Sequence, residues 1–128
     1  MKILAVDFDG VISDSALKSL FVSHNAYCKY FGSKVKKSFG GKLFTFDNWE
    51  EMKKEYKKEM DYYHRLRSYL GLSGDFFVII KIMEEQIQIK DQQAFIVYRN
   101  QIQFDYQFFR ELFFKEKEKW KRRIFIRC

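Results

Sequence analysis

Two aspartates, Asp7 and Asp9, stand one residue apart directly after the apolar run "KILAV" at residues 2–6. Alternate residues of an extended chain point to the same side, so the two carboxylates can share one cation or one substrate. A hard ion such as Mg²⁺ prefers oxygen ligands, and a nearby metal keeps the first carboxylate ionised and nucleophilic toward phosphorus. The second carboxylate is placed to act as general acid and base. The spacing therefore favours Mg²⁺-dependent phosphoryl chemistry.

The elements around this pair predict how the chain would position it. Residues 2–6 are continuously apolar, as in a strand buried on both faces of a parallel sheet. Side chains just beyond the carboxyl end of such a strand lie where open α/β sheets bind ligands. Ser13, Asp14 or Ser15 can then cap a helix. Its apolar stripe is Leu17, Leu20, Phe21, His24, Tyr27, Cys28 and Phe31, with Gly32 at its end.

Two other interpretations of the aspartates remain to be weighed. A polar turn after a strand would also place an Asp-Gly pair there, since Asp9 and Gly10 are common turn residues. A calcium-binding EF-hand loop does not fit, because Gly10 as its sixth position puts Ala5 first and Ala16 twelfth, where a glutamate is required. Calcium is not implied by this pattern.

The rest of the chain is predicted to be mainly helical. Residues 33–46 form a loop in this interpretation, with "KLFTF" at 42–46 as a possible short strand. Asp47 or Asn48 can cap one long amphipathic helix. Its stripe is Trp49, Met52, Tyr56, Met60, Tyr63 and Leu66. The absence of proline, where about six would be usual in a chain of 128 residues, agrees with long helices.

Three more helical segments follow. Ser73 or Asp75 can begin a helix with the stripe Phe76, Phe77, Ile80, Met83 and Ile87. Another helix is expected over residues 91–100. Asp105 can cap a last helix with Phe108, Phe109, Leu112 and Phe113 on one side. The predicted fold class is α/β, with one core strand and a mostly helical remainder.

The motif "VDFDGV" followed by "SDS" resembles the first motif of haloacid dehalogenase (HAD) superfamily hydrolases, D-x-D-G-[TV] after an apolar strand. The resemblance implies that Asp7 is the nucleophile, which forms an aspartyl-phosphate, and that Asp9 is the acid/base. It also implies Mg²⁺ held by the Asp7 carboxylate and the Asp9 backbone carbonyl. Val11 stands where Thr is commoner. The expected activity is phosphatase action on a phosphorylated small molecule.

Many members of that family insert a helical cap after the first strand and turn. By resemblance, residues 1–14 are the first core strand and catalytic turn, 15–120 the helical cap, and 121–128 a basic tail. The stretch "RLRSYLGLSGDFFVIIKIM" is also similar to a cap-helix junction of HAD-like hydrolases. Substrate-binding residues of the cap cannot be assigned from the sequence.

The family's later motifs were not found in this chain. They are a Ser or Thr after a second strand, a Lys or Arg on a later helix, and an acidic pair. We therefore expect a truncated form with little turnover alone, whose last residues, "IFIRC", come from an interrupted reading frame or pair with residues 2–6. The alternative from a different class is a non-catalytic helical fragment or interaction module that pairs with another chain or with itself.

The remaining features favour a cytoplasmic protein without nucleic-acid or membrane partners. Of the net charge of +7, residues 115–128 carry +5, so the basic residues are not spread over a phosphate-binding face. The longest apolar run, at 76–80, is too short to span a bilayer. His24 and His64 are predicted to pack among apolar residues rather than to bind metal. Cys28 and Cys128 suggest neither a disulfide framework nor a zinc site.

The last helix, over residues 108–123, has a second interpretation. It is apolar on one side and basic at its end, as are helices that lie on membranes or bind partners. The alternating Glu and Lys at 115–119 instead suit the solvated face of a packed cap helix. We favour the packed helix.

Overall fold

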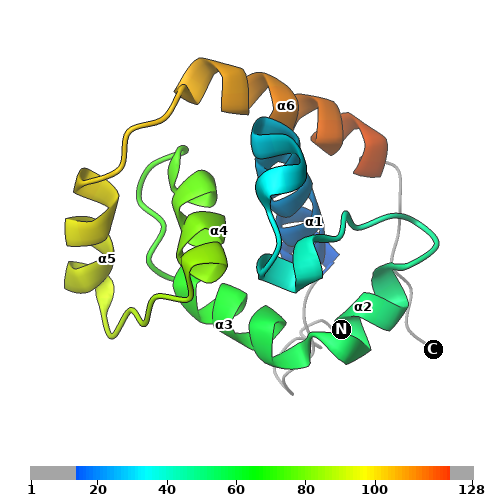
Figure 1. Ribbon diagram of the computed structural model, residues 1–128, viewed down its shortest axis with the longest axis horizontal. Helices are drawn as coiled ribbons and strands as arrows, with labels where there is room; N and C mark the ends of the chain where they lie inside the picture. The colour runs from blue at the N-terminus through cyan, green and yellow to red at the C-terminus, as the bar shows by residue number, and fades with distance from the viewer. Residues whose placement is uncertain (1–13, 122–128) are drawn as a thin grey trace, which may run out of the picture.

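In the computed structural model, residues 14–121 are described, and all their regular structure is helical (Figure 1). The α-helices are α1 (Asp14–Phe31), α2 (Trp49–Glu55), α3 (Lys57–Arg67), α4 (Asp75–Glu85), α5 (Gln92–Asn100) and α6 (Tyr106–Trp120). Two 3-10 turns, η2 (Gly32–Lys34) and η3 (Ser38–Gly41), follow α1. None of the helices within 14–121 combines the length and apolarity needed to cross a bilayer.

The expected α/β fold is wrong. Residues 14–121 contain no strand and form a small helical bundle, in which α1 packs against α4 and α6 and α3 packs against α4. The possible strand at 42–46 is absent for a local reason, because the Asn25 side chain takes the place of a neighbouring strand. Its Oδ1 accepts from the Phe44 N–H at 2.8 Å and its Nδ2 donates to the Phe44 carbonyl at 2.8 Å. Residues 2–6, the expected core strand, lie outside the described residues.

Helix α1 forms the centre of the bundle, as its sequence pattern predicts. The expected stripe is buried from Leu17 to Cys28, and Gly32, at φ +67°, ends the helix. The buried surface is wider than one stripe, because Ser23, His24 and Asn25 are consecutive and all buried. A helix buried over so much of its circumference needs hydrogen-bond partners for each polar side chain. Those partners come from the loop after α1 and from α3 and α6.

Aromatic rings fill the space between the helices. Phe77 of α4 is 1% exposed and stacks on Phe104 with ring centroids 3.9 Å apart and planes 1° apart. It also meets Phe109 of α6 edge-on at 5.3 Å and Tyr27 of α1 at 5.0 Å. Aromatic pairs of this kind add about 0.5–1.5 kcal/mol each beyond the area they bury. Phe77 therefore connects α1, α6 and the segment before α6.

The predicted long helix after residue 48 is interrupted. The structure has two helices, α2 and α3, that meet at Tyr56, where φ is −112° and ψ is 37°. The apolar stripe continues through Met52 and Met60, so its spacing gives no sign of the break. Tyr56 contacts the Phe39 ring at 6.0 Å, and its hydroxyl lies where a Cβ on Gly40 would come within 2.4 Å. The glycine allows the η3 turn to approach this junction.

Two of the predicted helix starts are confirmed, one just after residue 90 and the other just after residue 104. Asp91 accepts a hydrogen bond from the Ala94 N–H, and Asp105 accepts one from the Phe108 N–H. Asp75 acts differently from a simple cap: its carboxylate accepts from the N–H groups of Gly71 and Leu72 and pairs with Arg99 at 2.9 Å. Burial alone would raise the pKa of Asp75, but these hydrogen bonds hold it below its usual value.

Glu84 of α4 holds the loop that precedes η3. Its carboxylate accepts from the backbone N–H groups of Lys36, Lys37 and Ser38 at 2.8 to 3.1 Å. Burial tends to raise the pKa of Glu84, but these donors outweigh it and lower the pKa. The carboxylate thus stays ionised and fixes the loop to α4.

Glu116 is the buried carboxylate that joins α6 to α1. It is 1% exposed, and it receives hydrogen bonds from Asn25, from Lys29, whose ammonium is in direct contact, and from Lys119 at 3.1 Å. Burial tends to raise the pKa of Glu116, and the three donors reverse this and lower it. Removing the charge would leave Lys29 without its carboxylate.

We expect Glu116→Gln to lower the free energy of unfolding by about 1–3 kcal/mol, because hydrogen bonds to charged groups are lost inside the bundle. Urea denaturation at pH 7 measures this change. Glu118→Gln is the matched control: the Glu118 side chain is 72% exposed, so the variant should stay within about 0.5 kcal/mol of the original chain. Equal stabilities for the two variants would contradict this role of Glu116.

Candidate functional site

The predicted site residues Asp7 and Asp9 lie outside the described residues. Asp9 precedes the first residue of α1 by five positions. The described residues nearest to the motif in the sequence are therefore those of the first turns of α1.

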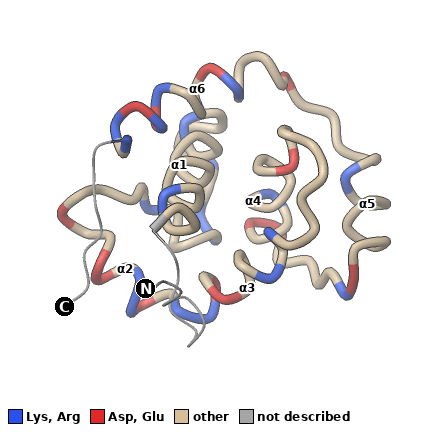
Figure 2. Tube along the Cα trace, turned by 180° about the vertical axis from the view of Figure 1, so that it is seen from behind, with Lys and Arg blue, Asp and Glu red and all other residues tan. Residues whose placement is uncertain are grey.

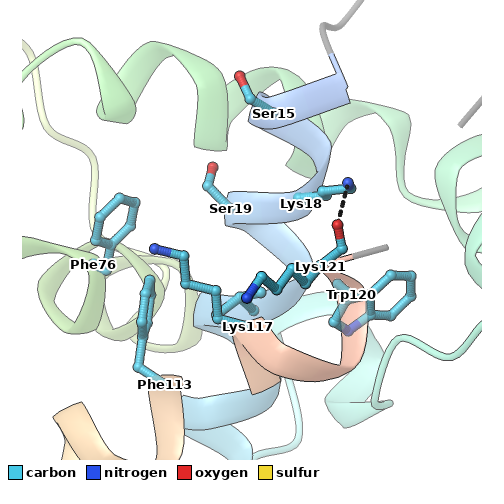
Figure 3. Close-up of a pocket in the computed structure, with 9 residues that line it drawn as sticks. Ser15, Lys18, Ser19, Phe76, Phe113, Lys117, Trp120 and Lys121 are labelled. Carbon is cyan, nitrogen blue, oxygen red and sulfur yellow. Dashed lines mark hydrogen bonds between the residues drawn. The ribbon is translucent and has the colours of Figure 1, made fainter. Parts of the chain in front are cut away.

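A pocket of about 410 Å³ lies beside these turns, between α1, α4 and α6 (Figure 3). Its apolar part comes from Val22, Phe76, Phe113 and Trp120. Its polar groups are the hydroxyls of Ser15 and Ser19 and the side chains of Lys18, Lys117 and Lys121. Ligand pockets commonly enclose about 300–1,000 Å³ and combine apolar walls with a few polar groups.

Helix periodicity brings these residues together. Ser15, Lys18, Ser19 and Val22 are spaced by three or four and share one face of α1. In the same way Phe113, Lys117, Trp120 and Lys121 share a face at the end of α6. Figure 2 shows basic and acidic residues alternating along this half of α6. The alternation at 115–119 was interpreted as a solvated face, which gave no sign that Lys117, and Lys121 just beyond it, share a side with Phe113 and Trp120.

The three lysines of the pocket differ in their contacts. Lys18 Nζ donates to the Lys121 carbonyl at 3.5 Å (Figure 3), and Lys121 Nζ is 3.6 Å from the Glu118 carboxylate. Lys117 Nζ lies 5.9 Å from the centre of the Phe114 ring, and within residues 14–121 no carboxylate comes within 4.0 Å of it. Its charge is therefore available to an anionic ligand.

A second set of polar side chains, on α3, borders the pocket through a contact with Ser19. The Tyr63 hydroxyl lies 3.1 Å from Ser19 Oγ and 3.4 Å from Ser23 Oγ, and burial raises the pKa of Tyr63. On α3, the buried Nε2 of His64 and Nε of Arg67 have no hydrogen-bond partner among residues 14–121. Burial, followed by the nearby Arg67 charge, lowers the pKa of His64. This part of α3 holds polar atoms that the bundle itself does not satisfy.

His24 is packed in the core, as predicted. Its Nε2 lies 3.1 Å from both the carbonyl and the hydroxyl oxygen of Ser38, and its ring meets Phe39 and Phe44 edge-on. Burial lowers the pKa of His24 to about 4, against the hydrogen bond that the Ser38 carbonyl accepts from its ring, which raises it. The imidazole is therefore neutral at pH 7.

The residues that would hold Mg²⁺ are those of the aspartate motif. Carboxylate and carbonyl oxygens at Asp7 and Asp9 match the preference of a hard cation. Within residues 14–121, no group of three or more His, Cys, Asp or Glu side chains could hold a metal ion. The described bundle therefore offers no competing metal centre of its own.

Comparison with protein-family models, with curated proteins and with solved structures finds no match for the chain.

Protonation of His24 should destabilise the fold. An unfolded chain binds this proton near pH 6.5 and the folded one only near pH 4, so stability is full above 6.5 and falls as the pH is lowered toward 4. The loss approaches about 1 kcal/mol per pH unit in that window. Urea denaturation between pH 4.5 and 7 measures it. His24→Gln should flatten the profile more than the control His64→Gln, and identical slopes in the two variants would contradict this assignment.

Proposed function

We propose that the chain is a HAD-like, Mg²⁺-dependent phosphatase of the cytoplasm, with Asp7 as nucleophile, Asp9 as acid/base and the helical bundle as the cap beside them. The motif "VDFDGVISDS" carries this proposal, because it runs directly into α1. Support comes from the first turns of α1, which line a pocket with lysine and serine side chains. Such groups suit a phosphorylated substrate.

The proposed reaction has two steps. The Asp7 carboxylate attacks phosphorus, the bond from phosphorus to the ester oxygen breaks, and Asp9 donates a proton to the leaving oxygen. Asp9 then accepts a proton from water, which attacks the aspartyl-phosphate, releases phosphate and restores Asp7. Bound Mg²⁺ would neutralise part of the negative charge on the phosphate.

The chain between the motif and the pocket is short. Six positions separate Asp9 from Ser15, a length that spans about 20 Å when fully extended. One substrate that binds in the pocket can therefore also reach the motif. This relation in sequence is why we assign the bundle a role in substrate binding.

A second candidate function, a non-catalytic module that binds another protein chain, is favoured by the exposed aromatic side chains of α6. Phe108 and Phe114 are 43% and 44% exposed, and Tyr106 is 39% exposed. Exposed aromatic residues on one helix are typical of interaction surfaces. Their position on α6 is compatible with either function, so turnover decides between them.

Turnover of p-nitrophenyl phosphate with Mg²⁺ tests the phosphatase proposal. We expect Asp7→Asn to abolish any activity, because an amide cannot serve as the nucleophile, and Asp9→Asn to reduce it about 10²-fold or more through loss of general acid–base catalysis. Asp47→Asn is the control, since Asp47 is an exposed carboxylate outside the pocket.

The assay is run on the chain alone and on the chain co-expressed with the product of the next downstream reading frame, because the later family motifs were not found in the sequence. Activity in either sample that depends on Asp7 supports a phosphatase. Activity that survives Asp7→Asn contradicts the assigned nucleophile. No activity in both samples contradicts the phosphatase proposal and favours the interaction module.

A further inference from the structure

We infer that a second pocket, between α1, α6 and the loop before α2, binds a monocarboxylate that carries a single aromatic ring. This pocket encloses about 170 Å³ and is lined by Asn25 and Lys29 of α1, by residues 43–46 and by the last turns of α6. Of its lining residues, Trp120 alone also lines the pocket assigned to substrate binding above. The inference is therefore independent of the proposed phosphatase function, and binding is measured without turnover.

The polar side of this second pocket carries one net positive charge. The ammonium groups of Lys29 and Lys119 both donate to Oε2 of Glu116, Lys29 in direct contact and Lys119 at 3.1 Å. Within residues 14–121, Glu116 is the one carboxylate within 4.0 Å of either ammonium. Two cations and one anion leave a charge of +1, which a singly charged ligand neutralises. A phosphate monoester, with nearly two negative charges at pH 7, would bring excess negative charge next to Glu116.

The two lysines keep hydrogen-bond donors for such a ligand. Each ammonium carries three N–H groups, and Glu116 takes one from each. The side chains of Lys29 and Lys119 are 35% and 57% exposed, so an ion from solvent reaches them without unfolding of the bundle. Thr45 adds a hydroxyl, because its Oγ1 accepts from the Asn48 N–H at 3.1 Å and its own proton remains to be donated. The two oxygens of a carboxylate can accept from these groups.

The apolar side of the pocket fits one ring. Leu43 and Phe46 are 40% and 39% exposed, and the Phe46 ring meets the Trp120 ring edge-on with centroids 4.5 Å apart. A ligand ring that covers these side chains removes apolar surface from water and adds aromatic contacts. A dry apolar cavity of about 150 Å³ holds benzene. The volume of about 170 Å³ therefore matches a single ring rather than a fused ring system.

The test is a two-dimensional ¹H–¹⁵N NMR titration of the full chain with phenylacetate at pH 7. We expect saturable shifts at the backbone amides of residues 43–46 and 116–120, with a dissociation constant of about 1 mM or lower for a ligand of this size. Lys119→Gln should weaken binding about fivefold or more, since a charge-assisted hydrogen bond is lost. Lys119→Arg should bind within about twofold of the original chain, because it restores the charge. The spectra also show whether each variant keeps the fold.

Two control variants lie on the same helix. Lys115→Gln removes an exposed lysine outside both pockets, and Lys117→Gln removes one that lines only the pocket between α1, α4 and α6. Each should change the affinity less than about twofold, because exposed charges outside the binding site contribute little. Weaker binding in Lys117→Gln than in Lys119→Gln would place the ligand in the other pocket and contradict the inference.

Three further ligands separate the contributions of ring and charge. Benzyl alcohol keeps the ring without the charge, acetate keeps the charge without the ring, and each should bind at least about fivefold more weakly than phenylacetate. Phenyl phosphate, which carries the second charge, should bind no more tightly than phenylacetate. The inference is overturned if phenylacetate does not shift these amides, if Lys115→Gln weakens binding as much as Lys119→Gln, or if either benzyl alcohol or phenyl phosphate binds more tightly than phenylacetate at this pocket.

Discussion

Burial of α1 on most of its surface is the constraint on which the bundle depends. Three consecutive residues of this helix, Ser23, His24 and Asn25, are buried and point in different directions, so each must find a partner in a different neighbour. Ser23 meets Tyr63 of α3, His24 meets Ser38 of the η3 turn, and Asn25 meets both Phe44 and Glu116. A buried polar group without a partner costs about 1–3 kcal/mol. These hydrogen bonds to α1 therefore fix the positions of α3, of α6 and of the loop that follows α1.

The helices could be predicted from the sequence because apolar spacing and capping are local signals. Asp91 and Asp105 begin helices where their sequence neighbours indicate, and the stripe of α1 is buried as expected. The α/β prediction was based on residues 2–6, which lie outside the described residues, whereas residues 14–121 are all helical in their regular structure. The possible strand at 42–46 was wrong because its hydrogen-bond partner is a single side chain, Asn25, 19 residues before Phe44. The break at Tyr56 was missed because the apolar spacing runs through it unchanged.

The candidate pocket was missed for a related reason. Two of its lysines, Lys117 and Lys121, occur within or just after a run of alternating charges, which alone indicates a solvated helix face. Only the packing of α6 on α1 separates this run into Glu116, which turns inward to Asn25 and Lys29, and Lys117 and Lys121, which border the pocket. Asp7 and Asp9 show the opposite case, since their chemistry is suggested by sequence and they lie outside the described residues.

The two hydrogen bonds between Asn25 and Phe44 affect how this chain can associate with other molecules. Residues 42–46 are rich in residues that favour extended pairing, and such segments can recruit a second chain through their open backbone groups. Asn25 occupies both the N–H and the C=O of Phe44, the central residue of this segment. A strand of a neighbouring molecule would have to replace these two hydrogen bonds before it could pair with this segment. One amide side chain thereby protects the segment from edge-to-edge aggregation.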